Sequence, residues 1–276
     1  MRGLGRIRRY RDVILMTLEQ TRKSIWRQLY NPQHETRPVF LVGCGRSGTS
    51  MLVKQLNRSW QVELYHEDNP AAFKQYRLRE FSVLDALVER SKAPAVVFKP
   101  ILSTTQTPQL LARFPDIRIV FPYRHYNDVV NSSLKKFGVE NRINHVRSWM
   151  ADDFGEFAVA PPPEATKALV RRLWRPDLNP ESGAALYWLF YNQLFYDMGL
   201  DKNERAFLIE YETLVNEPRA QFIALTHFLG LKFEERMITG IFASSVGRDN
   251  APAIDPTIQA ECEALYQRLS GDVSVR

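Results

Sequence analysis

The chain of 276 residues combines 45% hydrophobic and 12% aromatic residues with 25% charged residues, a composition that can bury a sizeable core. Its two cysteines, Cys44 and Cys262, exclude a disulfide framework and favour a reducing compartment. Apolar runs are too short to span a bilayer and the N-terminus lacks a secretion signal, so we expect a cytoplasmic protein.

The net charge of +6 lies in the first 30 residues, which carry eight basic and two acidic side chains. One face of a helix predicted in this arm collects four aliphatic side chains, Ile14, Leu18, Ile25 and Leu29. Such a helix could rest on an anionic membrane surface. Trp26 and Tyr30 extend its apolar face, which favours a helix docked on its own domain. We therefore expect a basic helical arm over 1–36, which could touch a membrane through residues 1–30, and a catalytic domain over 37–276.

Residues 39–56, VFLVGCGRSGTSMLVKQL, predict a strand, a glycine-rich loop and a helix. Gly43, Gly48 and Ser50 occupy positions of a Walker A loop, but Thr49 stands where the phosphate-binding lysine belongs. The cation of this loop is Arg46. Because amides at a helix N-terminus attract anions, the loop predicts a phosphate site that differs from that of a nucleotide hydrolase.

Short apolar runs alternate with helical stretches along the rest of the chain. Further strands are expected at 62–65, 95–98, 117–121 and 206–210, and helices near 79–91, 105–113, 127–137, 183–198 and 217–229. This order predicts an α/β fold, a P-loop-like three-layer α/β/α arrangement around a central parallel sheet of about five strands. The least regular stretch, 139–182, is expected to be an insertion on the acceptor side of the site.

Charged side chains follow the predicted strands. They are Arg46 in the first loop, His66, Glu67 and Asp68 after the second strand, Lys99 after the third and Arg124 after the fourth. Because the carboxyl ends of parallel strands meet at one edge, these groups should share a crevice. Cations there favour an anion over a metal ion. Glu210, which ends the last strand, could still hold Mg²⁺, so a nucleotide kinase or NTPase stays an alternative.

These residues carry a resemblance to a known family. GCGRSGTS resembles the 5′-phosphosulfate loop of sulfotransferases that use 3′-phosphoadenosine 5′-phosphosulfate (PAPS), and FPYRHYNDVVNSSLKKF resembles their second signature, with Arg124 and Ser132 as the residues that bind the 3′-phosphate. The similarity continues through RAFLIEYETLVNEPRAQFIALTHFLGL and SSVGRDN, so it spans residues 38 to about 270. Arg124 could instead be an ion-pair partner of Asp128.

The resemblance implies a metal-independent O-sulfotransferase with PAPS as its co-substrate. It assigns donor binding to ten residues, Gly45, Arg46, Ser47, Gly48, Thr49, Ser50, Arg124, Ser132, Ser244 and Arg248. Cytosolic members use a histidine shortly after the lysine of the third strand, but Lys99 is followed here by Pro100 and Ile101. In the branches of the family that modify sugars or tyrosyl proteins, a glutamate is the general base, and the resemblance to these branches implies this role for Glu67, with His66 as its competitor. Lys99 pairs with Glu67 or touches the sulfuryl group.

The acceptor is expected to be a carbohydrate or another hydroxylated molecule, and no nucleic acid. Aromatic residues of the insertion, Trp149, Phe154, Phe157 and Trp174, could line its pocket or pack the insertion onto the body. Core packing is expected for Trp188. A noncatalytic protein that binds a membrane or nucleic acid through residues 1–30 is the remaining alternative.

Overall fold

The computed structural model describes residues 21–31, 35–153, 160–242, 247 and 251–275. Its central sheet has five parallel strands in the order β2-β5-β1-β6-β7. The strands are β1 Arg37–Leu41, β2 Val62–Tyr65, β5 Ala95–Phe98, β6 Arg118–Tyr123 and β7 Ala206–Glu210, and a small hairpin adds β3 Phe73–Lys74 and β4 Arg77–Leu78. The predicted α/β fold with a parallel five-stranded sheet is confirmed.

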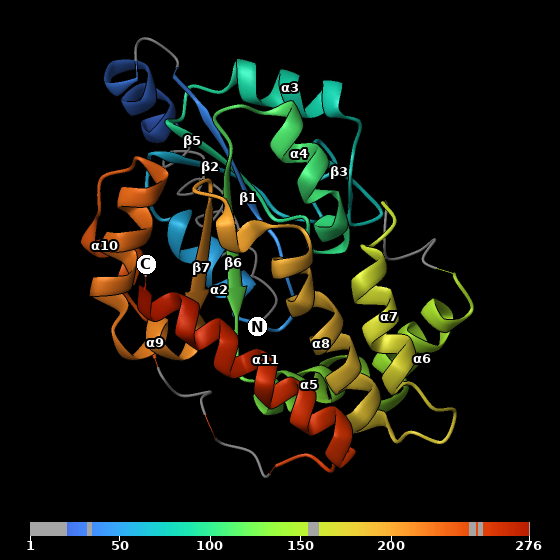
Figure 1. Cartoon of the computed structure of the whole chain (residues 1–276). Helices are drawn as coiled ribbons and strands as arrows, with labels where there is room; N and C mark the ends of the chain where they lie inside the picture. The colour runs from blue at the N-terminus through green and yellow to red at the C-terminus, as the bar shows by residue number, and fades with distance from the viewer. Residues whose placement is uncertain (1–20, 32–34, 154–159, 243–246, 248–250, 276) are drawn as a thin grey trace, which may run out of the picture.

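Side chains alternate between the two faces of the sheet, and helices cover both faces (Figure 1). Val39 and Leu41 of β1 face α2 Thr49–Leu56, α9 Tyr211–Asn216 and α10 Pro218–Leu229. Phe40 and Phe98 face the larger core. That core is built from α3 Phe81–Arg90, α4 Thr107–Arg113, α5 Tyr126–Phe137, α6 Val139–Met150, α7 Glu164–Leu173, α8 Pro180–Asp197 and α11 Pro256–Val275. The chain therefore forms three layers, α/β/α, as expected.

The stretch 139–182 is more regular than the sequence analysis expected. It holds α6 and α7 and begins α8, and α6 and α7 both pack on α8. Trp149 is buried and its ring stacks on Phe190 of α8, with centroids 4.2 Å apart. The expected irregularity is wrong for the described residues, because apolar side chains of α6 complete the core around α8. That 139–182 is an insertion on the acceptor side stays a prediction.

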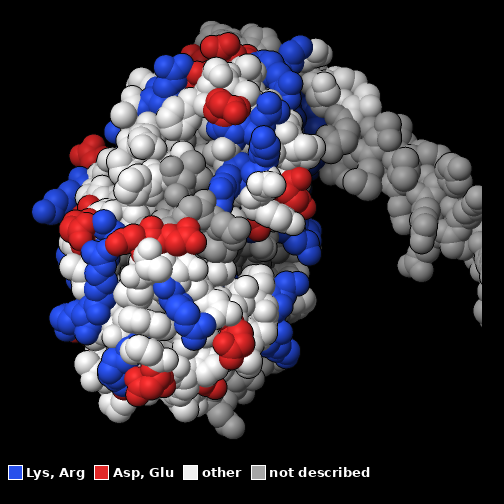
Figure 2. Space-filling view, turned by 90° about the vertical axis from the view of Figure 1, so that its right-hand side faces the viewer, with Lys and Arg blue, Asp and Glu red and all other residues white. Residues whose placement is uncertain are grey.

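Beyond the basic first 30 residues, the chain carries charges of both signs. Lys and Arg side chains are interspersed with Asp and Glu on the face that lies at the right of Figure 1 (Figure 2). Within the described residues, each helix is too short or too polar to cross a membrane.

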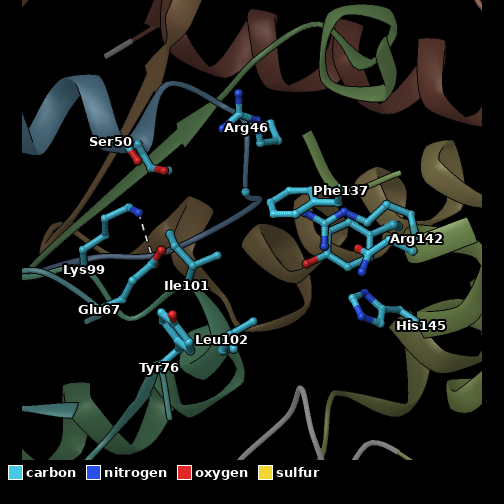
Figure 3. A pocket seen from close by; sticks show the side chains of 14 residues that line it. Arg46, Ser50, Glu67, Tyr76, Lys99, Ile101, Leu102, Phe137, Arg142 and His145 are labelled. Carbon is cyan, nitrogen blue, oxygen red and sulfur yellow. Dashed lines mark ion pairs between the residues drawn. The ribbon is translucent and has the colours of Figure 1, made fainter. Parts of the chain in front are cut away.

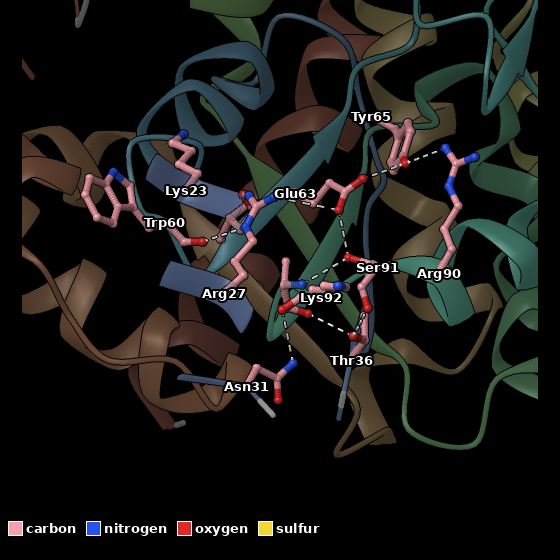
Figure 4. Close-up of polar contacts among 12 residues, drawn as sticks. Lys23, Arg27, Asn31, Thr36, Trp60, Glu63, Tyr65, Arg90, Ser91 and Lys92 are labelled. Atoms are coloured by element: carbon pink, nitrogen blue, oxygen red, sulfur yellow. Dashed lines mark hydrogen bonds and ion pairs between the residues drawn. The ribbon is translucent and has the colours of Figure 1, made fainter. Parts of the chain in front are cut away.

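A helix over residues 21–30 packs on the domain through its basic side chains (Figure 4). Lys23 Nζ donates to the carbonyl of Asn57 at 2.9 Å, and Arg27 Nε donates to the carbonyl of Trp60 at 2.9 Å. Arg27 also lies 3.8 Å from Glu63. Asn57 and Trp60 lie in the connection between α2 and β2 and Glu63 lies in β2, so the helix sits at the amino-terminal edge of the sheet.

The aliphatic face of this helix does not form the contact, contrary to expectation. Ile25 is 53% exposed and Leu29 is 70% exposed, whereas Lys23 is 5% exposed. The long basic side chains reach backbone carbonyls of the connection between α2 and β2 while their stems run along the domain surface. Ile14 and Leu18 lie outside the described residues. A peripheral membrane contact through residues 1–30 stays a prediction.

Candidate functional site

The glycine-rich loop joins the carboxyl end of β1 to α2, at the centre of the sheet. The Gly43 N–H donates to Thr104 Oγ1 at 2.9 Å, which ties the start of the loop to the segment after β5. Gly48 is the N-cap of α2 in a left-handed conformation, with φ +80°, and supplies no side-chain cap. The first amides of α2 are thus left for an external acceptor, the usual arrangement at an anion site.

Gly48 is required because the ring of Tyr211 lies directly against it. A Cβ at this position would overlap the ring carbons of Tyr211. Gly199 has a similar left-handed conformation, φ +70°, and a Cβ there would meet nothing within 4 Å. Alanine substitution at Gly199 therefore tests the backbone strain alone, whereas substitution at Gly48 adds the steric clash with Tyr211.

We expect Gly48→Ala to lower the free energy of unfolding by about 1–3 kcal/mol more than Gly199→Ala, since both pay the left-handed penalty and only the first overpacks Tyr211. Urea unfolding of the two variants measures the difference. Equal losses would show that Tyr211 can move aside without cost.

A crevice of about 250 Å³ lies beside the loop and contains both signature arginines. It is lined by Arg46, Gly48, Thr49, Ser50, Met51, Arg124, Ser132 and Tyr211. Arg46 Nε donates to Ser132 Oγ at 3.0 Å, and Arg124 stacks on the Tyr211 ring at 4.6 Å. Burial lowers the pKa of Arg46, and the nearby Arg124 and Arg142 lower it further. Two arginines therefore line this crevice, and Arg142 lies close enough to Arg46 to act on its charge.

Arg124 also makes the ion pair that the sequence left open. Its Nη2 lies 2.8 Å from Asp128 Oδ2, and its Nε lies 4.0 Å from Glu212 Oε1. Burial raises the pKa of Glu212 to about 7, so this carboxyl offers less than a full negative charge at neutral pH. The backbone carbonyl of Arg124 accepts a hydrogen bond from Trp188 Nε1 at 2.9 Å. The fully buried Trp188, a core residue as expected, thus holds the end of β6 in place.

A larger cavity of about 450 Å³ adjoins the crevice, and Arg46, Thr49 and Ser50 line both. Glu67 and Lys99 form one wall (Figure 3), with Lys99 Nζ 3.1 Å from Glu67 Oε2. Lys99 is 3% exposed. Glu67 faces the cavity, whereas its competitor His66 does not line it and contacts Asp68 at 3.1 Å.

The opposite wall comes from residues that the sequence analysis missed. They are Phe137, Asn141, Arg142, His145 and Tyr187, and Figure 3 shows Phe137, Arg142 and His145 across the cavity from Glu67. Burial, followed by the charge of Arg142, lowers the pKa of His145 to about 4, so its ring is neutral at pH 7. Asn141, Arg142 and His145 lie on α6, and the spacing of Ile143, Val146 and Met150 signals this helix in the sequence.

The remaining predicted residues lie as follows. Gly45 lines the larger cavity, while Ser47 is fully buried and lines neither space. Glu210 accepts hydrogen bonds from Tyr266, at 2.9 Å, and from Thr213, on the side of α11. Groups of three or more residues that could hold a metal are absent from the described part of the chain.

Part of the predicted site falls outside the described residues. Ser244 and Arg248 lie there, as do Phe154 and Phe157 of the stretch 139–182. Gly247, between the two former residues, is described, and its N–H donates to Asp128 Oδ2 at 3.3 Å.

Several solved structures are similar to this chain. The sulfotransferase domain of an olefin synthase from Synechococcus PCC 7002 is 16% identical, with 85% of this chain and 94% of that chain covered and a TM-score of 0.49. A sulfotransferase from Alicyclobacillus acidocaldarius is 16% identical, with 86% and 94% covered and a TM-score of 0.47. Mouse sulfotransferase SULT7A1, complexed with PAP, is 14% identical, with 87% and 86% covered and a TM-score of 0.46.

No curated protein matches the chain. The family model described as a sulfotransferase domain matches residues 36–246, which include the whole sheet and both signature segments. The chain therefore belongs to the sulfotransferase family.

Proposed function

We propose that this sulfotransferase takes its sulfuryl group from PAPS and transfers it to a hydroxyl of a carbohydrate or another hydroxylated acceptor, without a metal ion. One observation carries the proposal. Arg46, Arg124 and Ser132 line a single crevice beside the uncapped N-terminus of α2, and this crevice adjoins the cavity that contains Glu67. Two anionic groups of one nucleotide can thus be bound next to an acceptor pocket.

The donor would be held by its two phosphate positions. Amides of the loop and of the first turn of α2, together with the Arg46 guanidinium, bind the 5′-phosphosulfate. Arg124 and Ser132 bind the 3′-phosphate, and the stacking of Arg124 on Tyr211 orients its guanidinium. Ser244 and Arg248 complete this proposal as further groups for the 3′-phosphate; Gly247 between them contacts Asp128, the ion-pair partner of Arg124.

Transfer requires that the acceptor hydroxyl loses its proton as its oxygen attacks sulfur. Glu67 accepts this proton, the new S–O bond forms, and the bond between sulfur and the 5′-phosphate oxygen breaks. Arg46 stabilises the negative charge that develops on the leaving phosphate, so the products are a sulfate ester and 3′-phosphoadenosine 5′-phosphate (PAP). Lys99 orients the Glu67 carboxylate through their ion pair before transfer and, once Glu67 has taken the proton, is released to the sulfuryl oxygens.

A nucleotide kinase or NTPase is the competing function. Its chemistry needs a carboxylate near the loop to hold Mg²⁺. Glu210, the candidate from the sequence, is engaged by Tyr266 and Thr213, and it lines neither the crevice nor the larger cavity. These contacts favour the sulfotransferase mechanism.

Calorimetric titration with PAP and with ATP, each with EDTA and with added Mg²⁺, distinguishes the two functions. We expect PAP to bind at least about 10-fold more tightly than ATP, with an affinity that EDTA leaves unchanged, because protein cations neutralise both phosphates. A preference for ATP that depends on Mg²⁺ would reverse the assignment.

A further inference from the structure

Arg142 is a buried guanidinium that faces the larger cavity. The residue is 6% exposed and lies on α6, opposite Glu67 and Lys99 (Figure 3). Its guanidinium carbon lies 3.9 Å from the centroid of the Tyr187 ring and 4.5 Å from that of the Phe137 ring. Two aromatic side chains therefore hold the group, while its N–H bonds need acceptors elsewhere.

Within the described residues, Arg142 makes no hydrogen bond and no ion pair, and its Nε is buried without a partner. The other buried cations of the site differ in this respect. Lys99 pairs with Glu67 and Arg124 pairs with Asp128. A buried charge without an anion is costly, and native proteins keep few of them, so its presence beside a cavity needs an explanation.

The cavity around Arg142 joins this charge to an apolar surface. Tyr76, Ile101 and Leu102 line it together with the rings of Phe137 and Tyr187. A volume of about 450 Å³ lies in the range of small-molecule sites. An apolar pocket with one fixed guanidinium suits a small molecule that carries one anionic group.

We propose that Arg142 binds an anionic group of the acceptor, a carboxylate, phosphate or sulfate, and thereby turns the acceptor hydroxyl toward Glu67. This inference rests on the sulfotransferase function proposed above. The competing assignment gives the anion to the donor, because Arg142 lies beside the phosphate loop: its Nη2 is 3.5 Å from the position that a Cβ would take at Gly45. We assign it to the acceptor because Arg46, Arg124 and Ser132 already provide for both donor phosphates in the neighbouring crevice.

The test compares 4-hydroxyphenylacetate with 4-hydroxyphenylacetamide, which have nearly the same size and differ in charge. Each is titrated calorimetrically into protein saturated with PAP, and PAP binding is measured first. We expect the carboxylate to bind the wild type at least about 10-fold more tightly than the amide, a preference that Arg142→Gln removes. Arg147→Gln is the matched control, because Arg147 lies on the same helix and is exposed.

Each outcome has one meaning. Failure of PAP to bind the wild type refutes the proposed function rather than the role of Arg142. With PAP bound, weak or equal binding of the two probes, or a preference that persists in Arg142→Gln, overturns the inference. A loss of PAP affinity in Arg142→Gln with unchanged probe binding assigns the anion to the donor and also overturns it.

Arg142→Met gives a second measurement that does not need a probe. Removing a buried charge that lacks an anion should leave the melting temperature of the PAP-free protein at or above the wild-type value. A marked fall would show that Arg142 serves the fold through its two aromatic contacts, which would contradict a binding role.

Discussion

Replacing Arg46 by alanine is expected to lower kcat/KM for PAPS by about 10²–10³-fold and to weaken PAP binding by about 10- to 100-fold. Arg46 lines both the crevice and the larger cavity, so it reaches the junction between donor and acceptor. Its loss removes charge-assisted hydrogen bonds in the bound state and stabilisation of the leaving phosphate in the transition state. Steady-state kinetics with labelled PAPS and calorimetry with PAP measure the two effects separately.

The fold should tolerate this change. The change removes the hydrogen bond from Arg46 to Ser132. Arg219→Ala, at an exposed arginine that pairs with Glu235, is the control and should leave both constants unchanged. An Arg46→Ala enzyme with normal PAP affinity and normal turnover would remove the basis of the proposed donor site.

Glu67→Gln is expected to reduce kcat by about 10²–10⁴-fold while PAP affinity stays within about threefold. The amide keeps an oxygen that can accept from Lys99, which lies 3.1 Å from the carboxylate, but it cannot take a proton at neutral pH. Single-turnover transfer from labelled PAPS measures the chemical step directly.

Asp68→Asn provides a matched control for this prediction. Asp68 is the neighbouring carboxylate, its side chain is 72% exposed and it contacts His66. Its substitution should leave kcat unchanged. A strong loss of PAP affinity in Glu67→Gln with normal kcat would show that Glu67 serves the donor site and is not the base.

The parts of this protein that the sequence predicts well are those whose signal is local. The apolar run before Gly43 and the glycines around Arg46 indicate a strand and a phosphate loop without reference to the rest of the chain. Because the strands are parallel, their carboxyl ends lie at one edge of the sheet, and this brings Lys99 and Arg124 to the edge where the loop lies. Local spacing and a general rule of sheet topology were enough.

The far wall of the cavity depends on packing that the sequence does not display. Arg142 belongs to a helix, but which face of α6 meets the cavity is decided by its contacts with α8, about 40 residues later in the chain. The aliphatic face of the N-terminal helix was expected to dock on the domain, and Lys23 and Arg27 make the contact instead by donating to backbone carbonyls. A polar residue reveals a buried role only when its partners are known.

The spacing in α11 could have been recognised. Ile258, Cys262, Leu265 and Leu269 recur on one helical face, and Pro256 begins the helix. This helix carries Tyr266, whose hydroxyl donates to Glu210. Reading it from the sequence would have weakened the case for Glu210 as a metal ligand.

The position of the N-terminal helix has a practical consequence for surface-based assays. The helix sits at the amino-terminal edge of the sheet, whereas the crevice and the cavity lie beyond the carboxyl-terminal edge. Both native thiols are buried, and burial raises the pKa of Cys44 to about 12. A cysteine introduced at the exposed Ile25 would therefore react selectively with a maleimide-coated surface. The immobilised enzyme would then have its crevice and larger cavity facing the solution.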